Sequence, residues 1–260
     1  MGKTLVITGG SSGIGLATAN LFREKGWRVF ELSRHGDSHD GITHINCDVT
    51  SQPSVRQAVE EVLRQAESID VLISNAGFGI SGAIEFTEPD DARRQMDVNF
   101  FGALNITQAV LPSMRERKEG RILYTSSVAA VLPVPYQAFY SASKAAINAM
   151  ALALANEVRQ FNIRVGCLMP GDVATGFTAA RDKSEKGAEV YQNISKAVSA
   201  MEKDEQNGMR PEQMAQIFYK MATRRNPAPY YIGGTVYKIF CLLNRLLPTR
   251  FVNWIEGAMY

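Results

Sequence analysis

The sequence predicts a doubly wound α/β domain, in which helices cover both faces of a parallel sheet. Short apolar runs rich in valine and isoleucine alternate with longer segments of helical periodicity, a pattern typical of repeated βαβ units. A glycine-rich turn joins the first apolar run to the first helical segment. Right-handed crossovers between parallel strands produce an open sheet, and ligands bind in the crevice at the carboxyl ends of its strands.

The predicted strands lack the alternation of polar and apolar residues, which indicates that both their faces are buried. They span residues 5–8, 28–32, 71–74, 121–126 and 164–169. Helical periodicity predicts helices over residues 14–25, 54–65, 90–117 in one or two pieces, and 140–161. The polar, helix-breaking stretch is 176–211.

Composition is that of one soluble globular domain spanning residues 1–260, since 45% of the residues are hydrophobic and 21% are charged. With 28 basic and 26 acidic residues, the net charge of +2 is too balanced for nucleic-acid binding. Cys47, Cys167 and Cys241 are widely separated and have no zinc-binding spacing. They favour a reducing, cytoplasmic environment.

Neither an export signal nor a membrane-spanning segment is expected. The chain starts directly with a strand-like run and has no basic segment followed by an apolar stretch and a cleavage site. The apolar stretch 230–248 is interrupted by Lys238, Asn244 and Arg245 and is shorter than the roughly 20 apolar residues of a spanning helix.

The glycine turn is a candidate anion site. It reads Thr8-Gly9-Gly10-Ser11-Ser12-Gly13-Ile14-Gly15 and leads directly into the first helix. Bare backbone lets a pyrophosphate approach N–H groups, and the helix dipole favours its negative charge. The alternative is a glycine-rich turn with no ligand, but the position between the first strand and the first helix favours a dinucleotide.

Tyr140 and Lys144 are candidates for proton transfer because residues four apart share one face of a helix. A phenol titrates near 10 in isolation, so a tyrosine that acts as a base near neutral pH needs a neighbouring positive charge. Lys144 would supply that charge. The pair alone is weak, since this spacing arises often by chance.

Several further motifs occur in the order found in one family. They are Asn46-Cys47-Asp48-Val49, Asn75-Ala76-Gly77, Asn99, Ser126-Ser127, Tyr140-Ser141-Ala142-Ser143-Lys144 and Pro170-Gly171-Asp172-Val173-Ala174-Thr175. Together with the glycine turn they span residues 8–175, and the chain resembles the short-chain dehydrogenases/reductases, which have a Rossmann fold. This resemblance implies a nicotinamide-dependent oxidoreductase.

The resemblance also implies catalytic roles. Ser127 would hydrogen-bond the substrate oxygen while Tyr140 exchanges a proton with it, and Ser126 is ranked second for this role. Lys144 would also reach the ribose of the cofactor, and Asn99 would hold a water molecule that joins Lys144 to solvent. The alternative for Asn99 is an asparagine bonded within a distorted helix.

For cofactor binding, the resemblance assigns Asp48 with Val49 to the adenine ring. Asn75, Ala76 and Gly77 would support the ribose side, while Val173 and Thr175, after Pro170, would touch the nicotinamide. The glycine turn would contribute Gly9, Ser11, Ser12, Gly13, Ile14 and Gly15.

The end of the second strand favours NADP(H) over NAD(H). Ser33 occupies the position where NAD-specific relatives carry aspartate, and Arg34 follows it with a guanidinium that pairs well with a 2′-phosphate. Ser11 and Ser12 add hydroxyl donors on the same side. The alternative is that Arg34 is a surface charge and that Glu31 binds the ribose as the acidic residue of NAD-specific enzymes does.

No metal site is expected. The three histidines, His35, His39 and His44, lack convergent partners, and we predict them to be surface residues near the adenine end.

Residues after Thr175 are expected to select the substrate. The segment 176–210 is predicted to form a lid, with an apolar stripe of Tyr191, Ile194, Val198 and Met201; the alternative is a helix packed on the domain edge. The segment 230–260 is an apolar C-terminal extension that could cover the cleft, pack against another subunit or lie on a membrane surface. Its stripe comprises Val236, Ile239, Phe240, Leu243, Leu247, Phe251, Trp254 and Ile255.

The predicted reaction interconverts a secondary alcohol and a ketone on a small hydrophobic substrate. A resemblance to hydroxysteroid and retinol dehydrogenases favours a hydroxysteroid or a bile acid. The alternatives are a reductase of long-chain carbonyls or retinoids and a non-catalytic NADP(H) sensor. The resemblance further implies a homodimer or homotetramer formed through the helices that carry Asn99 and Tyr140.

Overall fold

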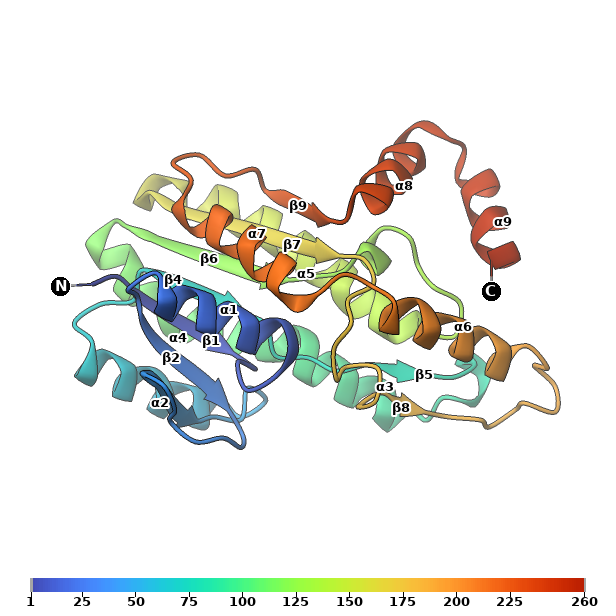
Figure 1. Cartoon of the computed structure of the whole chain (residues 1–260), viewed down its shortest axis with the longest axis horizontal. Helices are drawn as coiled ribbons and strands as arrows, with labels where there is room; N and C mark the ends of the chain where they lie inside the picture. The colour runs from blue at the N-terminus through green and yellow to red at the C-terminus, as the bar shows by residue number, and fades with distance from the viewer. Residues whose placement is uncertain (1, 260) are drawn as a thin grey trace.

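The computed structural model describes residues 2–259, in which a parallel sheet is flanked by helices on both faces (Figure 1). Its strand order is β3-β2-β1-β4-β6-β7-β9, and every pairing between neighbours is parallel. The doubly wound fold is therefore confirmed. The strands are β1 Thr4–Thr8, β2 Arg28–Ser33, β3 Ile42–Asn46, β4 Val71–Ser74, β6 Gly120–Thr125, β7 Ile163–Pro170 and β9 Tyr230–Gly233.

Two helical layers bury the two faces of the sheet. On one face, Leu5 and Ile7 of β1 pack with α1 (Gly13–Glu24) and α7 (Pro211–Thr223). On the other, Val6 packs with the second layer, which consists of α2 Gln52–Gln65, α4 Gly102–Arg117 and α5 Ala138–Glu157. Because β1 is covered on both sides, all five of its residues are buried. This explains the absence of polar alternation in its sequence.

Side-chain hydrogen bonds hold the carboxyl ends of β1, β4 and β6 together. Thr8 Oγ1 accepts hydrogen bonds from the backbone N–H groups of Asn75 (3.0 Å) and Ala76 (3.1 Å). The amide of Asn75 donates to the carbonyl of Gly9 at 3.0 Å and accepts from the Thr125 hydroxyl at 2.9 Å. The loops after these three strands are therefore fixed relative to one another.

The predicted helix over residues 90–117 is present but contains a local irregularity. It comprises α3 (Pro89–Met96), a π-helical turn (Asp97–Phe101) and α4. Such turns are rare and often occur at functional sites. Here the turn contains Asn99, whose side chain bonds to other elements.

In the main sheet and the helical layers that cover it, β3, β9 and α7 were not predicted. The strand β3 has the half-exposed sequence Ile-Thr-His-Ile-Asn, and β9 has four residues within the expected extension. Both lie at the edges of the sheet, where one side of each strand has no partner and the apolar pattern weakens. Helix α7 begins at Pro211, the end of the predicted helix-breaking stretch. Proline is well suited to the first turn of a helix.

The chain after β7 adds further short elements, one of which pairs with an earlier strand. Two short strands, β5 (Ile80–Ser81) and β8 (Asp182–Lys183), pair beside α6 (Ile194–Gln206). Helices α8 (Thr235–Leu246) and α9 (Thr249–Met259) form a hairpin that projects beyond the carboxyl end of β9 (Figure 1). Among residues 2–259, no helix is both long enough and apolar enough to cross a bilayer.

Candidate active site

A cavity of about 1050 Å³ lies at the carboxyl ends of the strands. At one end it is lined by the glycine turn after β1, and at the other by α8 and α9. Tyr140 and Lys144 of α5, together with Ser127 after β6, line its wall. The cavity therefore joins the predicted dinucleotide site to the predicted proton-transfer residues and then to the apolar extension.

The glycine turn has the backbone geometry of an anion cradle. Gly9 and Gly13 have φ angles of +64° and +52°, a region that glycine adopts without strain. A side chain at Gly15 would place its Cβ 2.1 Å from the carbonyl oxygen of Gly9. Ser12 is the N-cap of α1, and the first turn of that helix contains no acidic residue. These features fit the pyrophosphate of a dinucleotide, because the helix N-terminus points unblocked N–H groups at it.

Some predicted cofactor residues lie outside the cavity, on the open surface beyond the glycine turn or beneath it. Arg34 is exposed after β2, and its backbone carbonyl accepts a hydrogen bond from the Asn46 side chain at 2.6 Å. Asp48 accepts hydrogen bonds from both the backbone and the hydroxyl of Thr50. The other predicted cofactor residues that do not line the cavity are Ser11, Gly15, Ser33 and Val49.

Glu31 and His44 form a buried pair beneath the glycine turn. His44 Nδ1 lies 2.5 Å from Glu31 Oε2, and the side chains are 12% and 3% exposed. A Cβ on Gly10 would contact Glu31 Cγ at 2.6 Å, so this carboxylate supports the turn from below. The prediction that His44 is a surface residue is therefore wrong. Glu31 is buried away from the open ribose side, which argues against the alternative that it binds a ribose hydroxyl.

Tyr140 and Ser127 meet at the cavity wall, and their side chains are hydrogen-bonded. Ser127 caps a short 3₁₀ turn after β6 and accepts a hydrogen bond from the Ala129 N–H at 3.1 Å. By contrast, Ser126 is buried and donates to the Lys144 carbonyl at 3.3 Å. The local bonding therefore favours Ser127 over Ser126 as the serine that faces a substrate.

Burial sets the ionisation of the tyrosine and the lysine. Desolvation raises the pKa of Tyr140 to about 12, against the lowering effect of the Ser127 hydrogen bond. Desolvation also lowers the pKa of Lys144 to about 8. The Lys144 ammonium lies 5.7 Å from the centre of the Tyr140 ring and donates to the Thr125 carbonyl at 2.8 Å. In this state Tyr140 is a phenol at neutral pH, the form that can donate a proton.

Asn99 is 1% exposed and bridges two elements. Its amide group accepts from the N–H of Phe78 and donates to the carbonyl of Phe78 and to the hydroxyl of Ser143, each at 3.0 Å. These partners lie outside the helix that carries Asn99, so the alternative of a purely local backbone bond is wrong. A Cβ on Gly77 would lie 3.0 Å from Asn99 Oδ1 and 3.5 Å from Lys144 Nζ. Because Gly77 has no side chain, the space between Asn99 and Lys144 stays open.

The loop after β7 closes the cavity over the glycine turn. A Cβ on Gly13 would lie 3.3 Å from Thr175 Cβ, so Thr175 packs against the turn. Pro170, Val173 and Thr175 all line the cavity, as predicted for residues near the nicotinamide. The remaining predicted cofactor residues along this wall are Gly9, Ser12, Gly13, Ile14, Asn75, Ala76 and Gly77.

Sequence reasoning missed the carboxylates of the cavity. Asp172, Asp204, Glu205 and Glu256 line it, whereas Lys144 is the one lysine or arginine in its described lining. Their positions in the sequence are dispersed, so no spacing indicated them. Asp172 could have been noticed, because it stands inside a motif that was otherwise assigned to the cofactor.

These carboxylates differ in their partners. The Arg181 side chain is fully buried and pairs with Glu205, which also accepts from the Thr178 hydroxyl at 2.6 Å. Asp172 accepts a hydrogen bond from the Tyr237 hydroxyl, and desolvation raises its pKa. No salt bridge to Asp172 is found within residues 2–259.

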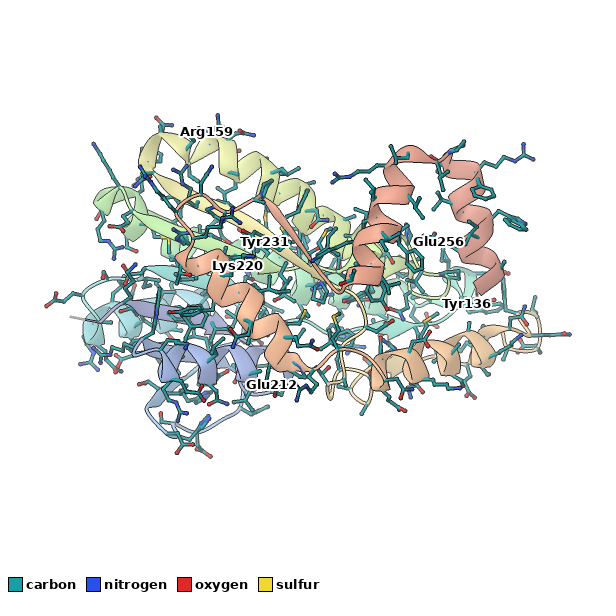
Figure 2. The ribbon with its side chains drawn as sticks, turned by 45° about the horizontal axis from the view of Figure 1, so that its top comes forward. Tyr136, Arg159, Glu212, Lys220, Tyr231 and Glu256 are labelled. Carbon is teal, nitrogen blue, oxygen red and sulfur yellow. The ribbon has the colours of Figure 1, made fainter. Side chains whose placement is uncertain are left out.

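The predicted lid and extension both contribute to the cavity. In α6, Ile194, Val198 and Met201 are buried, and Met201 reaches the cavity. Figure 2 labels Glu256 on α9, whose cavity-facing residues also include Val252 and Ile255. The extension was expected to cover the cleft, to pack against another subunit or to lie on a membrane surface. The structure shows that one side of the α8–α9 hairpin covers the cleft.

Known proteins are similar to this chain in sequence and in fold. The family model described as short chain dehydrogenase matches residues 3–186. A 3-ketodihydrosphingosine reductase of Bacteroides thetaiotaomicron is 39% identical over 264 residues, which cover 99% of this chain and 98% of the relative. A short-chain dehydrogenase from Streptomyces avermitilis has a similar structure, with a TM-score of 0.85 and 26% identity over 99% of this chain and 97% of that one.

A third protein bears on the cofactor. The 3-ketoacyl-(acyl-carrier-protein) reductase of Brucella melitensis, solved with NADH, has a TM-score of 0.76 and 25% identity over 89% of this chain and 96% of that one. The shared fold thus accommodates a nicotinamide dinucleotide but does not distinguish NADPH from NADH. The family match covers more than half of the chain, and its motifs coincide with the cavity described above. The chain belongs to the short-chain dehydrogenase/reductase family of oxidoreductases.

Proposed function

We propose that this protein is an NADP(H)-dependent reductase that converts a long-chain 2-amino ketone into the corresponding secondary alcohol. The observation that carries the proposal is the cavity, which combines three features in one space. It contains the Tyr140–Ser127 pair, an apolar wall from α8 and α9, and the carboxylate of Asp172. A ketone with an alkyl chain and a neighbouring ammonium group would use all three.

The proposed chemistry assigns one role to each polar residue. Ser127 holds the carbonyl oxygen, and Tyr140 donates the proton that this oxygen needs to become a hydroxyl. The bound nicotinamide supplies the hydride to the carbonyl carbon. Lys144 stabilises the tyrosinate that remains, and Asn99 with Gly77 provides the space for a water molecule through which the proton is replaced from solvent.

The preference for NADP(H) rests on Arg34. Its guanidinium is exposed at the end of β2, where a 2′-phosphate would lie, and the competing acidic residue Glu31 is buried beneath the glycine turn. A bidentate pair between guanidinium and phosphate is stronger than a hydrogen bond to a hydroxyl. This arrangement supports NADP(H) as the better ligand.

Apolar surfaces from separate parts of the chain support a long alkyl substrate. Leu132 and Val134 line one side of the cavity, and Phe240, Leu243 and Val252 of the extension line another. The relative from Bacteroides thetaiotaomicron is named for 3-ketodihydrosphingosine, a long-chain ketone with an amino group beside the carbonyl. We therefore rank the long-chain alternative ahead of a hydroxysteroid or bile acid, for which no specific feature of the cavity argues.

Asp172 is proposed to recognise the substrate ammonium group. It directly follows the Pro170-Gly171 turn at the end of β7, on the wall that also contains Tyr140. Glu205 already has Arg181 as its salt-bridge partner, whereas the carboxylate of Asp172 accepts its hydrogen bond from the neutral Tyr237 hydroxyl. An ammonium group on the carbon next to the reacting carbon would give Asp172 a charge-assisted hydrogen bond and would offset the desolvation of its carboxylate.

The test compares a long-chain 2-amino ketone with the same ketone lacking the amine, each assayed with NADPH. In the wild type we expect a higher kcat/KM for the amino ketone. Asp172→Asn should lower that value about 10- to 100-fold, the usual range for a hydrogen bond to a charged group, and should barely change the value for the deaminated ketone. The Asn side chain can still accept the Tyr237 bond, so the fold should be preserved.

The outcomes separate the parts of the proposal. Asp204→Asn is the matched control, since Asp204 also lines the cavity and the variant leaves the carboxylate of Asp172 in place. A loss confined to Asp204→Asn would reject Asp172 while retaining ammonium recognition. Faster turnover of 3-ketosteroids than of either long-chain ketone would reject the proposed substrate class. No NADPH oxidation with any ketone would favour the non-catalytic sensor.

We also propose that the protein forms a homodimer or homotetramer and that it is located in the cytoplasm. Phe101 at the start of α4 and Leu152 of α5 are exposed apolar residues on the helices implied in the subunit contact. They support a homodimer or homotetramer. Cys47, Cys167 and Cys241 are free thiols, which supports a reducing, cytoplasmic location.

A further inference from the structure

The outer side of the α8–α9 hairpin exposes more large apolar side chains than any other part of the described chain. Ile239, Leu242 and Leu246 of α8 are 53%, 56% and 71% exposed. Phe251 and Trp254 of α9 are also exposed, and their rings stack with centroids 6.1 Å apart. None of these five residues lines the cavity. We call them the outer apolar surface.

This surface is distinct from the cavity wall but continuous with it. In α8, the cavity-lining residues Phe240, Leu243 and Leu247 alternate with the outer residues at helical spacing. In α9, Val252 faces the cavity while the neighbouring Phe251 faces outward. The hairpin therefore presents one apolar side to the cavity and another to solvent.

Basic side chains border the outer apolar surface on both helices. Lys238 and Arg245 are seven residues apart and so lie on one side of α8, and Arg250 lies in the first turn of α9. All three are exposed, and none forms a salt bridge within residues 2–259. The single carboxylate of the two helices, Glu256, lines the cavity instead. The exposed side of the hairpin is therefore apolar at its centre and positive at its edge.

We infer that this face of the α8–α9 hairpin docks on an anionic lipid bilayer, with the outer apolar surface in the interfacial region and Lys238, Arg245 and Arg250 against the headgroups. An amphipathic helix with a basic border and large apolar residues is the type that lies in the plane of a membrane interface. Trp254 suits this depth because its ring is apolar and its N–H is polar.

A second copy of this chain fits the surface less well. A two-fold interface places the same patch of both subunits together, so the three basic residues of one copy would approach those of the other. The exposed side of the hairpin offers no carboxylate to compensate these charges. An anionic bilayer supplies the complementary charge, and each basic residue near such a surface strengthens binding about fivefold.

Binding of the purified protein to vesicles tests the inference without relying on turnover. Sedimentation with vesicles of phosphatidylcholine alone is compared with vesicles that also contain phosphatidylserine, at low and at physiological salt. We expect binding to the anionic vesicles, weakened by salt. The triple variant Lys238→Gln, Arg245→Gln and Arg250→Gln should reduce it about a hundredfold, since each neutralised charge removes about a factor of five.

A second variant tests the apolar contribution. Ile239→Ser, Leu246→Ser and Trp254→Ser, combined, should abolish detectable binding to either vesicle type, while NADPH oxidation with a water-soluble ketone stays unchanged because these residues do not line the cavity. Two controls are matched to the variants. Lys25→Gln with Arg56→Gln and Arg159→Gln removes three exposed charges elsewhere, and Ile84→Ser with Val190→Ser removes exposed apolar residues elsewhere. Both controls should bind like the wild type.

Three results would overturn the inference. They are absence of wild-type binding to anionic vesicles, equal binding by the charge-neutralised variant, and an oligomer that dissociates when the outer apolar surface is changed to serine. The last result would assign the surface to a second copy. Because none of these measurements depends on the ketone that is reduced, failure of the proposed substrate would leave this test unaffected.

Discussion

The chain up to Thr175 and the chain after it are built in different ways. In the first region, the strands are buried on both faces and the loops after them are tied by hydrogen bonds among Thr8, Asn75 and Thr125. In the second region, α6, α8 and α9 contribute residues to the cavity, and the α8–α9 hairpin leaves apolar side chains in solvent. The difference teaches that chemistry requires fixed geometry, whereas substrate entry requires accessible surface.

The comparison predicts that the proton-transfer residues of the first region affect every substrate alike. Tyr140→Phe removes the proton donor, so kcat should fall about 100- to 10,000-fold, the usual contribution of general acid catalysis. The factor should be the same for long-chain and short ketones, because the proton goes to the same oxygen in each. Fluorescence titration should find NADPH affinity within about twofold of the wild type. A factor that varied strongly with the ketone would break the division between the two regions.

A second prediction concerns the cofactor end of the first region. Arg34→Ala should raise the Kd of NADPH about 10- to 100-fold and leave that of NADH nearly unchanged, because only NADPH has the 2′-phosphate. Isothermal titration with both dinucleotides measures the two constants directly. Lys25→Ala, which removes an exposed charge at the carboxyl end of α1, is the control. Equal weakening of both dinucleotides would mean that Arg34 is only a surface charge.

The smallest expected effect is on stability. Lys144 is 4% exposed, and its pKa is lowered to about 8 from 10.5 by desolvation. The unfolded chain therefore binds this proton more tightly than the folded chain, so the lysine destabilises the cofactor-free protein below pH 8. Lys144→Met should raise the free energy of unfolding by about 1–3 kcal/mol at pH 7 while turnover is lost.

The pH dependence checks the sign of this effect. Above pH 8 the folded wild type has lost the Lys144 proton, and the unfolded chain loses it progressively as the pH approaches 10.5. The destabilisation caused by burying the ammonium group therefore disappears over this range. The stability difference between Lys144→Met and the wild type should therefore shrink over that range in denaturant titrations. A constant difference from pH 7 to pH 10 would show that burial of the ammonium group is not its cause.

Local sequence patterns were sufficient to predict some elements of the fold but not others. The strands around Val6, Leu72 and Ile122 were predictable because burial on both faces leaves a continuous apolar run. The Tyr140–Lys144 pair was predictable because four residues make about one helical turn. The edge strands β3 and β9 were not, since half-exposed sequence looks like loop.

The features that the sequence did not predict depend on contacts between segments that are far apart in the chain. Glu31 and His44 are thirteen residues apart and belong to neighbouring strands, so only the pairing of β2 with β3 reveals their buried contact. Asp172 and Tyr237 are 65 residues apart and meet only because α8 follows β9 beside the end of β7. No spacing in the chain could indicate either contact.

The sequence by itself determined the five inner strands of the sheet, the glycine turn and the family to which the chain belongs, because strand burial, helical spacing and turn chemistry are local properties. The tertiary structure decided which side chains enter the cavity and which side of the C-terminal hairpin remains outside. Both depend on how helices are placed against the sheet. That placement is set by packing between segments far apart in the chain, and a linear pattern does not record it.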